Sequence, residues 1–475
     1  MIYPELQFKP RLSVLSPQQV EQIHWATLEL LERTGVQVTH PQARELLHGA
    51  GARIHGDRVH LPAWMVEDAI RTAPSRVILG QRDGTRSVFL EGDKVWFGPS
   101  LDCIDYLDPV SGERRRFASD DCRITSSVAD ALPNFSWVMT IGMADDVPAS
   151  VADRVIAKQV LTYCEKPLVF CCKDVNSTRD IYEMYLLVAG GEEQFQQAPT
   201  CVHYSEPISP LLYYDPAVEK ILFCAEKGIP LINYPAPQGG STAPATFAGE
   251  IVQGSAESLS GLVLAQLVRP GAPFSYGAFA TVMDMKTTIF SYGAAEMSLM
   301  VAAMAQMAQH YRLPFFGTAG CSDAKLPDAQ AAAEAAFSCL SSALSGANLV
   351  HDSGWLDHGS VASPAFMVLV NEILHMVNQH MGGIPMDDEA IALDLMDQVG
   401  PGGHYLLEEH TLKHFRNVWY SDLFDRSIYD QWQAQGAKRF EERLHEQTRL
   451  AMEHQAAPLP DDVAQELARM EKHWE

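Results

Sequence analysis

The sequence lacks the features that mark several classes of protein. No stretch approaches the ~20 consecutive apolar residues of a membrane span, and the N-terminal residues MIYPELQFKPRLSVLS contain no apolar signal-peptide core. Basic residues are scarce, because 35 Lys and Arg stand against 60 Asp and Glu, giving a formal net charge of -25. Such a surface repels polyanions and argues against nucleic acid as a partner. We therefore expect a cytoplasmic, globular protein.

Ligand-binding motifs based on cysteine, histidine or glycine are also missing. The nine cysteines form no CxxC pair, and an odd number of scattered thiols suits a reducing compartment. The adjacent Cys171 and Cys172 are predicted to be small apolar core residues. His410 and His414 have helical i,i+4 spacing but not the HExxH order, so we predict no metal site. No GxGxxG loop follows an early strand and no GxSxG motif occurs, which argues against a dinucleotide fold and a hydrolase elbow.

Two patterns of apolar residues divide the chain. Helical spacing predicts helices over residues 17–34, 41–48 and 62–73, within a mainly helical N-terminal segment of residues 1–90. From residue 91 short apolar runs alternate with amphipathic stretches, as in a parallel sheet with crossover helices. The runs number eight and occupy residues 95–100, 137–143, 167–174, 200–207, 230–240, 273–279, 314–320 and 348–354.

Eight strands with intervening helices predict an α/β fold, a (β/α)₈ TIM-type barrel over residues 91–385. The helix-like segments between the runs are residues 151–164, 216–228, 250–268, 294–312 and 328–346. An open doubly wound sheet is the alternative. After residue 385 the sequence is charged and amphipathic, which predicts a helical C-terminal extension over residues 386–475 packed beside the barrel.

Barrel enzymes place their active sites at the carboxyl ends of the strands. The residues expected there include many aromatic ones and no obvious pair of nucleophile and base: Phe97, Ser100, Asp102, Lys173, Asp174, Tyr204, Glu206, Gln238, Gly239, Gly240, Tyr276, Phe279, Ser322, Asp323, Lys325, His351, Asp352 and Trp355. Aromatic faces and distant carboxylates are what hold a quaternary ammonium, although ordinary barrel packing also uses aromatic residues. Nearby, Arg114, Arg115 and Arg116 follow the turn DPVSGE and predict a hairpin with a solvated basic tip that could dock an acidic partner.

Four long segments resemble the trimethylamine methyltransferase family: LSPQQVEQIHWATLELLERTGVQV, GTAGCSDAKLPDAQAAAEAAF, GANLVHDSGWLDHGSVASPAFMVLVNEI and LFDRSIYDQWQAQGAKRFEER. The resemblance covers nearly the whole chain and implies a (β/α)₈ barrel that passes a methyl group to the cobalt of a separate corrinoid protein. Founding members carry pyrrolysine, whereas this chain has only standard residues. It therefore resembles the branch without pyrrolysine, for which the resemblance implies a quaternary amine such as glycine betaine as methyl donor.

On this resemblance we assign site residues. Phe97, Tyr204, Tyr276 and Trp355 are the expected walls of an aromatic cage, with Asp102 and Asp323 offsetting the ammonium charge. Asp323 could instead cap the helix that begins near Asp328. His351 is the expected catalytic residue and, with Gln238 and Lys325, a candidate for holding a substrate carboxylate.

The resemblance also sets expectations for partners. The chain itself is expected to bind no cofactor, because the corrinoid belongs to the partner protein. A homo-oligomer is possible, and the apolar helix over residues 297–308 could lie on the barrel exterior or at a subunit interface.

Two other functions stay open on the sequence. One is a barrel lyase or isomerase acting on a small acid, with Lys325 or Lys173 as base or Schiff-base former. The other is a binding or scaffold protein that has kept the barrel without catalysis.

Overall fold

The computed structural model describes residues 9–474, and eight short parallel strands close into a barrel within it. The strands are β6 (Trp96–Pro99), β9 (Val138–Met139), β10 (Leu168–Phe170), β11 (Cys201–Ser205), β13 (Leu231–Asn233), β15 (Phe274–Ser275), β18 (Phe316–Thr318) and β19 (Leu349–Ser353). They pair in the orders β15-β13-β11-β10-β9 and β18-β19-β6. Parallel bridges between Phe97 and Phe135 and between Tyr276 and Phe315 join these two sheets into a ring. The barrel prediction is confirmed, each predicted run contains one strand of the barrel, and the doubly wound alternative is wrong.

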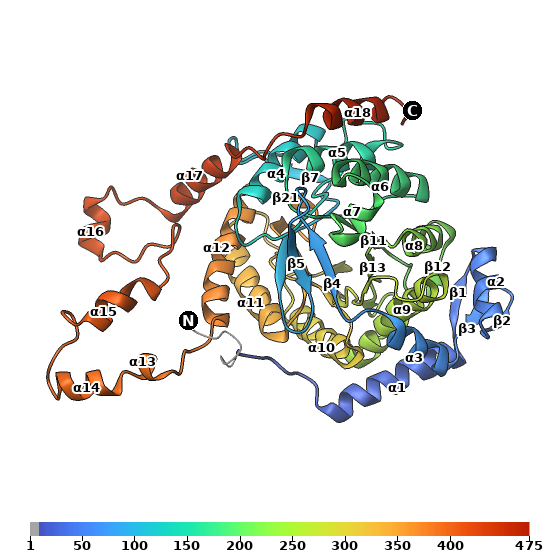
Figure 1. Cartoon of the computed structure of the whole chain (residues 1–475), viewed down its shortest axis with the longest axis horizontal. Coiled ribbons are helices and arrows are strands. Elements are labelled where there is room, and N and C mark those ends of the chain that lie inside the picture. The colour runs from blue at the N-terminus through green and yellow to red at the C-terminus, as the bar shows by residue number, and fades with distance from the viewer. Residues whose placement is uncertain (1–8, 475) are drawn as a thin grey trace.

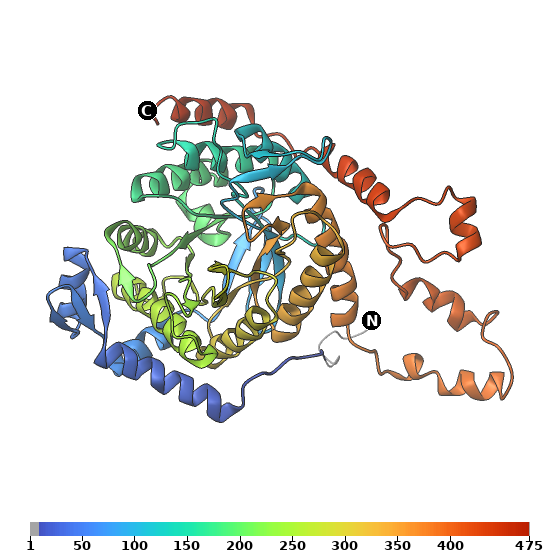
Figure 2. The same ribbon diagram turned by 180° about the vertical axis from the view of Figure 1, so that it is seen from behind.

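A helix follows each barrel strand and forms the outer layer that surrounds the barrel in Figures 1 and 2. These helices are α4 (Ser119–Ala131), α5 (Ala152–Tyr163), α6 (Val175–Ala189), α8 (Asp215–Lys227), α9 (Phe247–Val268), α10 (Ala295–Tyr311), α11 (Ala329–Ser345) and α12 (Pro364–Met381). Among the described helices, α9 alone is long and apolar enough to cross a membrane, but 83% of its apolar window is buried inside the protein. It packs against α1, α3 and α8, so its apolar character serves the core.

The N-terminal segment contains the three predicted helices, α1 (Pro17–Arg33), α2 (Pro41–Gly49) and α3 (Ala63–Thr72). It also contains five strands that were not predicted. Three of them, β1 (Val36–Val38), β2 (Arg53–His55) and β3 (Arg58–His60), form a small sheet with β12 (Leu212–Tyr213), and a short helix, α7 (Glu192–Gln197), precedes β11. Strands of three residues are too short to show the alternation that reveals a strand in a sequence.

The hairpin of β4 (Val77–Gly80) and β5 (Arg86–Leu90) crosses the end of the barrel that faces the viewer in Figure 1. The Gly80 amide donates to the Pro199 carbonyl just before β11, and the Trp96 indole at the start of β6 donates to the Phe89 carbonyl. Both contacts are at the amino ends of barrel strands. The hairpin therefore closes the end opposite the expected active site.

Strands inserted after the barrel strands cover the other end, which we call the mouth. β7 (Asp105–Leu107) and β8 (Arg114–Arg116) follow β6 and form a sheet with β20 (Trp355–Leu356) and β21 (Val361–Ala362), which follow β19. A second sheet contains β14 (Gln238–Gly239), β16 (Thr281–Asp284) and β17 (Ile289–Phe290). The mouth is thus framed by short strands from loops far apart in the sequence.

The predicted hairpin at Arg114–Arg116 exists and its arginines are exposed to solvent, but they lie beside the tip of the hairpin rather than at it. The three arginines form strand β8 rather than the turn, and each is paired with an aspartate. Arg115 makes two hydrogen bonds to Asp121, at 2.5 and 2.7 Å, and Arg114 bridges Asp105 and Asp357. The arginines fasten the mouth sheet to the barrel, and the partner that sequence spacing could not reveal is Asp357, which lies 243 residues from Arg114 along the chain.

The C-terminal part is helical as expected, but only its last two helices pack beside the barrel. α17 (Phe440–Met452) packs against α4 and α12, and α18 (Asp461–Glu471) against α6. Before them, α13 (Asp388–Ile391), α14 (Leu393–Val399), α15 (Glu409–His414), the 3₁₀ turn Phe415–Asn417 and α16 (Tyr429–Ala434) stand away from the barrel at the left of Figure 1.

Candidate active site

Four aromatic rings meet on the barrel axis near the mouth. They belong to Tyr204 on β11, Tyr234 directly after β13, Phe316 on β18 and His351 on β19. The His351 imidazole stacks on Phe316 with ring centroids 4.4 Å apart, and the Tyr234 ring stands edge-on to both, at 4.9 Å from Phe316 and 5.3 Å from His351. Because the rings come from four strands on different sides of the barrel, they meet only by pointing inward. They form the floor of the site.

Two carboxylates next to this floor lie deep in the protein but still have solvent-exposed side chains. The Tyr204 hydroxyl donates to Glu206 Oε1 at 2.5 Å. Asp102, in the loop after β6, and Glu206, directly after β11, both have exposed side chains. Burial raises the pKa of Asp102 to about 7, with the negative charges of Glu206 and Asp153 as further causes. Burial also raises the pKa of Glu206.

A third carboxylate, Asp352, is fully buried and held rigidly. It accepts hydrogen bonds from Ser100 Oγ at 3.3 Å and from Thr318 Oγ1, and it contacts His351 Nδ1. Asp352 has φ 80 and Asp102 has φ 57, both in the left-handed region that non-glycine residues rarely occupy. Such strained backbone is concentrated where side chains must be aimed at a ligand.

Of these three carboxylates, Asp102 borders a cavity of about 540 Å³ at the strand ends. Asp102, Asp145 and Asp153 line it, together with Arg116 and Lys173. The wall therefore presents more acidic than basic groups, with the two cations contributed by β8 and by the loop after β10. A site with this balance attracts a cation and can also accommodate a ligand that carries a second, negative group.

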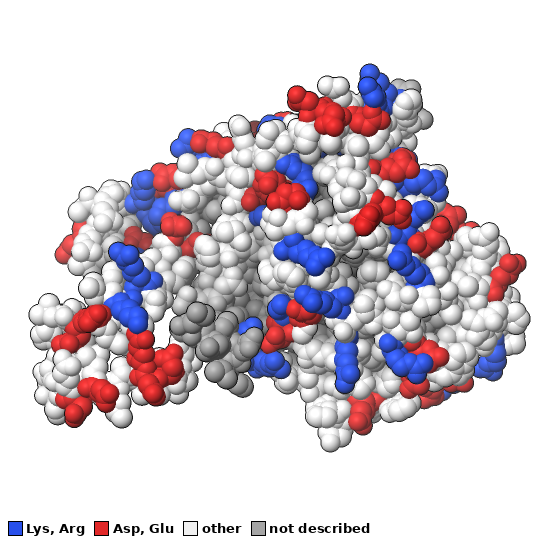
Figure 3. Space-filling model, viewed as in Figure 1, with Lys and Arg blue, Asp and Glu red and all other residues white. Residues whose placement is uncertain are grey.

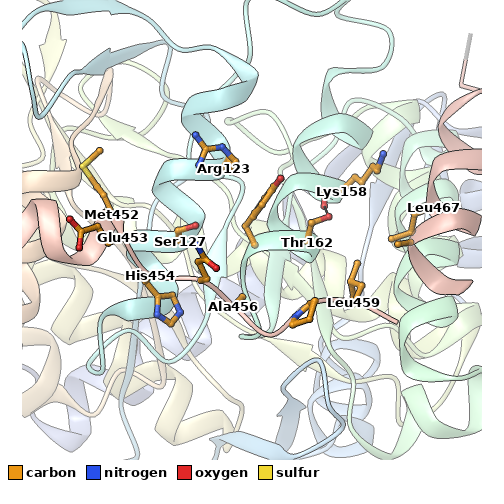
Figure 4. Close-up of a pocket in the computed structure, with 14 residues that line it drawn as sticks. Arg123, Ser127, Lys158, Thr162, Met452, Glu453, His454, Ala456, Leu459 and Leu467 are labelled. Carbon is orange, nitrogen blue, oxygen red and sulfur yellow. Dashed lines mark hydrogen bonds between the residues drawn. The ribbon is translucent and has the colours of Figure 1, made fainter. Parts of the chain in front are cut away.

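A larger cavity, of about 750 Å³, lies elsewhere. It is enclosed by α4, α5 and the chain that links α17 to α18 (Figure 4). His454 in its wall is hydrogen-bonded to Asp130 at 2.7 Å. This cavity is on the outside of the barrel, away from the strand ends, so it is not the candidate active site.

Aromatic residues from the inserted loops form a second group above the floor. The Trp355 ring on β20 lies edge-on to Tyr292 with centroids 5.1 Å apart, and Tyr292 contacts Phe279 at 4.8 Å and Phe290 at 5.3 Å. The Trp355 indole is directed at Cys103 Sγ. Ring faces above and below the carboxylates are the elements of a cage for an alkylated ammonium ion. No group of three or more His, Cys, Asp or Glu in residues 9–474 is arranged to hold a metal ion.

Some predicted cage residues lie in this site and others do not. Tyr204 is in the floor and Trp355 is in the upper group. Phe97 is a correction: Gly98 beside it faces the Trp137 ring of the barrel interior, so alternation along β6 turns Phe97 toward the helices. Tyr276 is a second correction, because its hydroxyl is 2.6 Å from Ser255 Oγ on α9, outside the barrel.

The predicted polar ligands are also divided. Asp102 faces the cavity. His351 was expected at the rim of the barrel but lies within β19, where it is part of the floor. Asp323 instead accepts hydrogen bonds from Ser291 and the Tyr292 amide, so it fixes a loop. The helix after it is capped by Asp328 itself.

Lys325 and Gln238 do not line the cavity either. Lys325 is exposed and paired with Asp357 at 3.4 Å. Gln238 lies in β14, whose backbone pairs with β16. Both come from loops whose return path a linear sequence does not reveal.

Sequence reasoning missed several residues that the fold brings to the site. Tyr234 and Phe316 lie within predicted strands, but nothing marked them as inward-facing. Glu206 was expected at a strand end but was given no role. Tyr292 and Asp153 come from a loop and a helix start that no motif identifies. Alternation along each strand could have found the first two.

The raised pKa of Asp102 predicts a pH dependence for binding a permanently charged amine. A carboxyl with a pKa of about 7 is neutral at pH 6 and charged at pH 8, so its attraction for the cation appears only as pH rises. We expect KM for a quaternary amine to fall roughly tenfold between pH 6 and pH 8. Initial rates measured across this range test the expectation, and a flat KM profile would contradict it.

The barrel has an acidic cavity at the carboxyl ends of its strands and an aromatic floor on its axis, which is where enzymes of this fold place their active sites. Residues 2–473 match the trimethylamine methyltransferase (MTTB) family. Among known proteins, the chain is 33% identical to trimethylamine methyltransferase MttB of Desulfitobacterium hafniense strain DSM 10664 / DCB-2, over 95% of this chain and 92% of that protein. It is 30% identical to the glycine betaine methyltransferase of Desulfitobacterium hafniense strain Y51, over 90% of this chain and 89% of that protein.

Among solved structures, the Methanosarcina barkeri monomethylamine methyltransferase MtmB aligns over 95% of this chain and 96% of its own, with 11% identity and a TM-score of 0.46. The sequence matches show that this chain belongs to the trimethylamine methyltransferase family.

Proposed function

We propose that the protein transfers a methyl group from a quaternary amine, with glycine betaine as the leading candidate, to the Co(I) of a cognate corrinoid protein in the cytoplasm. The tertiary amine, dimethylglycine for this donor, is released. The observation that carries the proposal is a pair of solvent-facing carboxylates, Asp102 and Glu206, set among inward-facing rings. Support for the reaction class comes from the family and from the two relatives named for trimethylamine and glycine betaine.

The chemistry asks little of the protein beyond positioning. When the cobalt nucleophile attacks a methyl carbon, the carbon–nitrogen bond breaks and its electron pair stays on nitrogen, so the leaving group is a neutral amine that needs no proton. The rings and carboxylates hold the cation and direct one methyl group toward the mouth. They should not stabilise the full positive charge too strongly, because that charge diminishes toward the transition state.

A carboxylate on the donor would need its own partners. Within the described residues, the Tyr234 hydroxyl and His351 Nε2 are buried and have no hydrogen-bond partner. Buried polar atoms are usually satisfied, so a ligand atom at the floor would complete them. At the cavity edge, Arg116 and Lys173 offer positive charge to a donor that extends further. These four residues are our candidates for distinguishing betaines from simple alkylamines.

The two lysines named for the lysine-based alternative do not fit that role. A Schiff-base or general-base lysine should be buried beside the substrate. Lys325 is paired with Asp357, and Lys173 is exposed with its ammonium near the carbonyls of Ala149 and Ser150. Neither is enclosed within the floor of the site.

His351 is proposed as the residue that contacts the methyl donor. Its replacement should show whether its nitrogens are needed for catalysis or its ring only for packing. His351→Phe keeps a flat ring against Phe316 but removes both nitrogens. We expect its kcat/KM for glycine betaine to fall roughly tenfold to a hundredfold, the usual cost of one lost polar contact in a buried site, with little change in melting temperature. Unchanged turnover in this variant would remove His351 from the mechanism.

The proposed reaction is tested by mixing the protein with a reduced corrinoid protein and a panel of methyl donors. The panel should contain glycine betaine, carnitine, choline and trimethylamine, and visible absorption should follow the conversion of Co(I) to methyl-Co(III). We expect methylation with at least one quaternary donor and appearance of the matching tertiary amine. Methylation by trimethylamine alone would overturn the assignment of a quaternary donor, and no reaction with any donor would overturn the proposed function.

A further inference from the structure

Residues 382–436, here called the arm, form a long excursion between two helices that pack on the barrel. The chain leaves after α12 and returns before α17, and α12 and α17 contact each other. In both ribbon views most of the arm stands clear of the helix ring (Figures 1 and 2), and Leu423, near its end, is its one buried residue. None of α13, α14, α15 and α16 contains a buried residue. An ordered connection of this length without a core of its own is rare in a compact domain unless it serves a function.

The arm is also strongly apolar on its surface. Fourteen of the 28 exposed large apolar side chains in the described residues lie in it, including Ile384, Leu406 and Leu407, each more than three-quarters exposed. Short helices are not stable in water without tertiary packing. A soluble monomer rarely exposes so much contiguous apolar surface. The arm must therefore be covered in the functional protein.

We propose that the arm packs against a second copy of this chain, and that two copies exchange their arms about a twofold axis. Fourteen large apolar side chains expose on the order of 1,500 Å², so two exchanged arms would bury roughly 3,000 Å² on the arm side alone. That area lies in the range of permanent homodimers and well above that of transient encounters. The inference is independent of the reaction proposed for the barrel.

The position of the arm favours a second copy over a corrinoid protein. Met381, where the arm begins, lies beside Pro10, Leu344 and Gly346, at the barrel end that the β4–β5 hairpin closes. A corrinoid protein must reach the mouth at the opposite end and leave again in each cycle. A large apolar contact at the wrong end of the barrel suits a permanent neighbour.

The flank from which the arm departs offers a receiving surface. α11, α12 and α17 lie side by side there, and each exposes a large apolar side chain: Phe337, Met376 and Leu450. In a twofold arrangement the arm of each copy would cross this flank of the other, as an isologous interface requires. The arm carries ten acidic and three basic residues, visible as red patches between white ones in Figure 3, so it is a poor match for an anionic membrane.

The test compares the mass of the full chain with that of arm variants by light scattering after gel filtration. The wild type should form a dimer, or a larger assembly built from dimers. The double variant Leu406→Lys/Leu407→Lys places two charges in the contact and should halve the mass at micromolar concentration. Trp25→Lys, an equally disruptive change of an exposed apolar residue on α1, should leave the mass unchanged.

Circular dichroism shows whether the variants keep the barrel fold, and the milder variant Leu412→Ser should weaken assembly if the double variant does not fold. A monomeric wild type would overturn the proposal. So would an oligomer that the arm variants leave intact, or an arm that becomes covered only when the corrinoid protein is added.

Discussion

The double variant Asp102→Asn/Glu206→Gln is expected to raise KM for a quaternary amine by roughly 30-fold to 150-fold. Asp102 lines the cavity and Glu206 lies beside the aromatic floor, and burial raises the pKa of both, so each attracts a cation more strongly than a surface carboxylate would. Losing both is expected to cost about 2–3 kcal/mol of binding free energy. The measurement is KM at pH 8 with glycine betaine and choline as donors.

Asn and Gln have nearly the same shapes as Asp and Glu, so the double variant removes the two charges with little change in packing. Asn tolerates the left-handed backbone of Asp102 at φ 57 better than most residues. The pKa of Asp102 is raised in the folded protein, so its charge lowers stability as pH rises from its ordinary value of 3.8 to about 7. The variant should therefore melt no lower than wild type at pH 8. Glu67→Gln, on the exposed face of α3, is the matched control, and an unaltered KM in the double variant would contradict the cation site.

Among glycine-to-alanine substitutions near the site, Gly277→Ala is expected to lower the stability of the protein most. A Cβ at this position would lie 2.2 Å from the Phe316 carbonyl oxygen and 2.9 Å from the Tyr234 ring. Backbone cannot yield to such a contact, so we expect a loss of about 3 kcal/mol or more in the free energy of unfolding. Any protein that folds should have a displaced aromatic floor and turn over poorly.

Chemical denaturation measures this loss. The control is Gly49→Ala, at the end of α2, where an added Cβ would have no atom within 4 Å. Its stability should match or slightly exceed that of wild type, because alanine loses less backbone entropy than glycine in a helix. Equal stability of the two variants would mean that the floor is not packed as tightly as these distances imply.

The barrel could be predicted from the sequence because its strands are buried on both faces and read as continuous apolar runs. Each run, such as residues 314–320, contained one strand of the ring. The site was predicted less well. An apolar run does not say which side chains point to the axis, so Tyr276 was expected in the cage while Tyr234 was overlooked.

Loop residues were the hardest to place. Asp323 and Lys325 follow a barrel strand as predicted, but their directions are set by contacts with Ser291 and Asp357, which lie more than 30 residues away along the chain. Glu206 and Asp102 are likewise brought together only by the fold. Their shared field arises only when β6 and β11 lie on one barrel, and no local motif encodes it.

Because the β4–β5 hairpin covers the amino end of the barrel, the site is open only at the mouth. Phe89 and Gly80 are hydrogen-bonded to the amino ends of the strands, so the hairpin covers that end of the barrel. Whatever docks over the mouth seals in the small molecule beneath it. Under the proposed function, the donor therefore binds before the partner docks and the demethylated amine departs after the partner leaves, so the architecture imposes an order on each catalytic cycle.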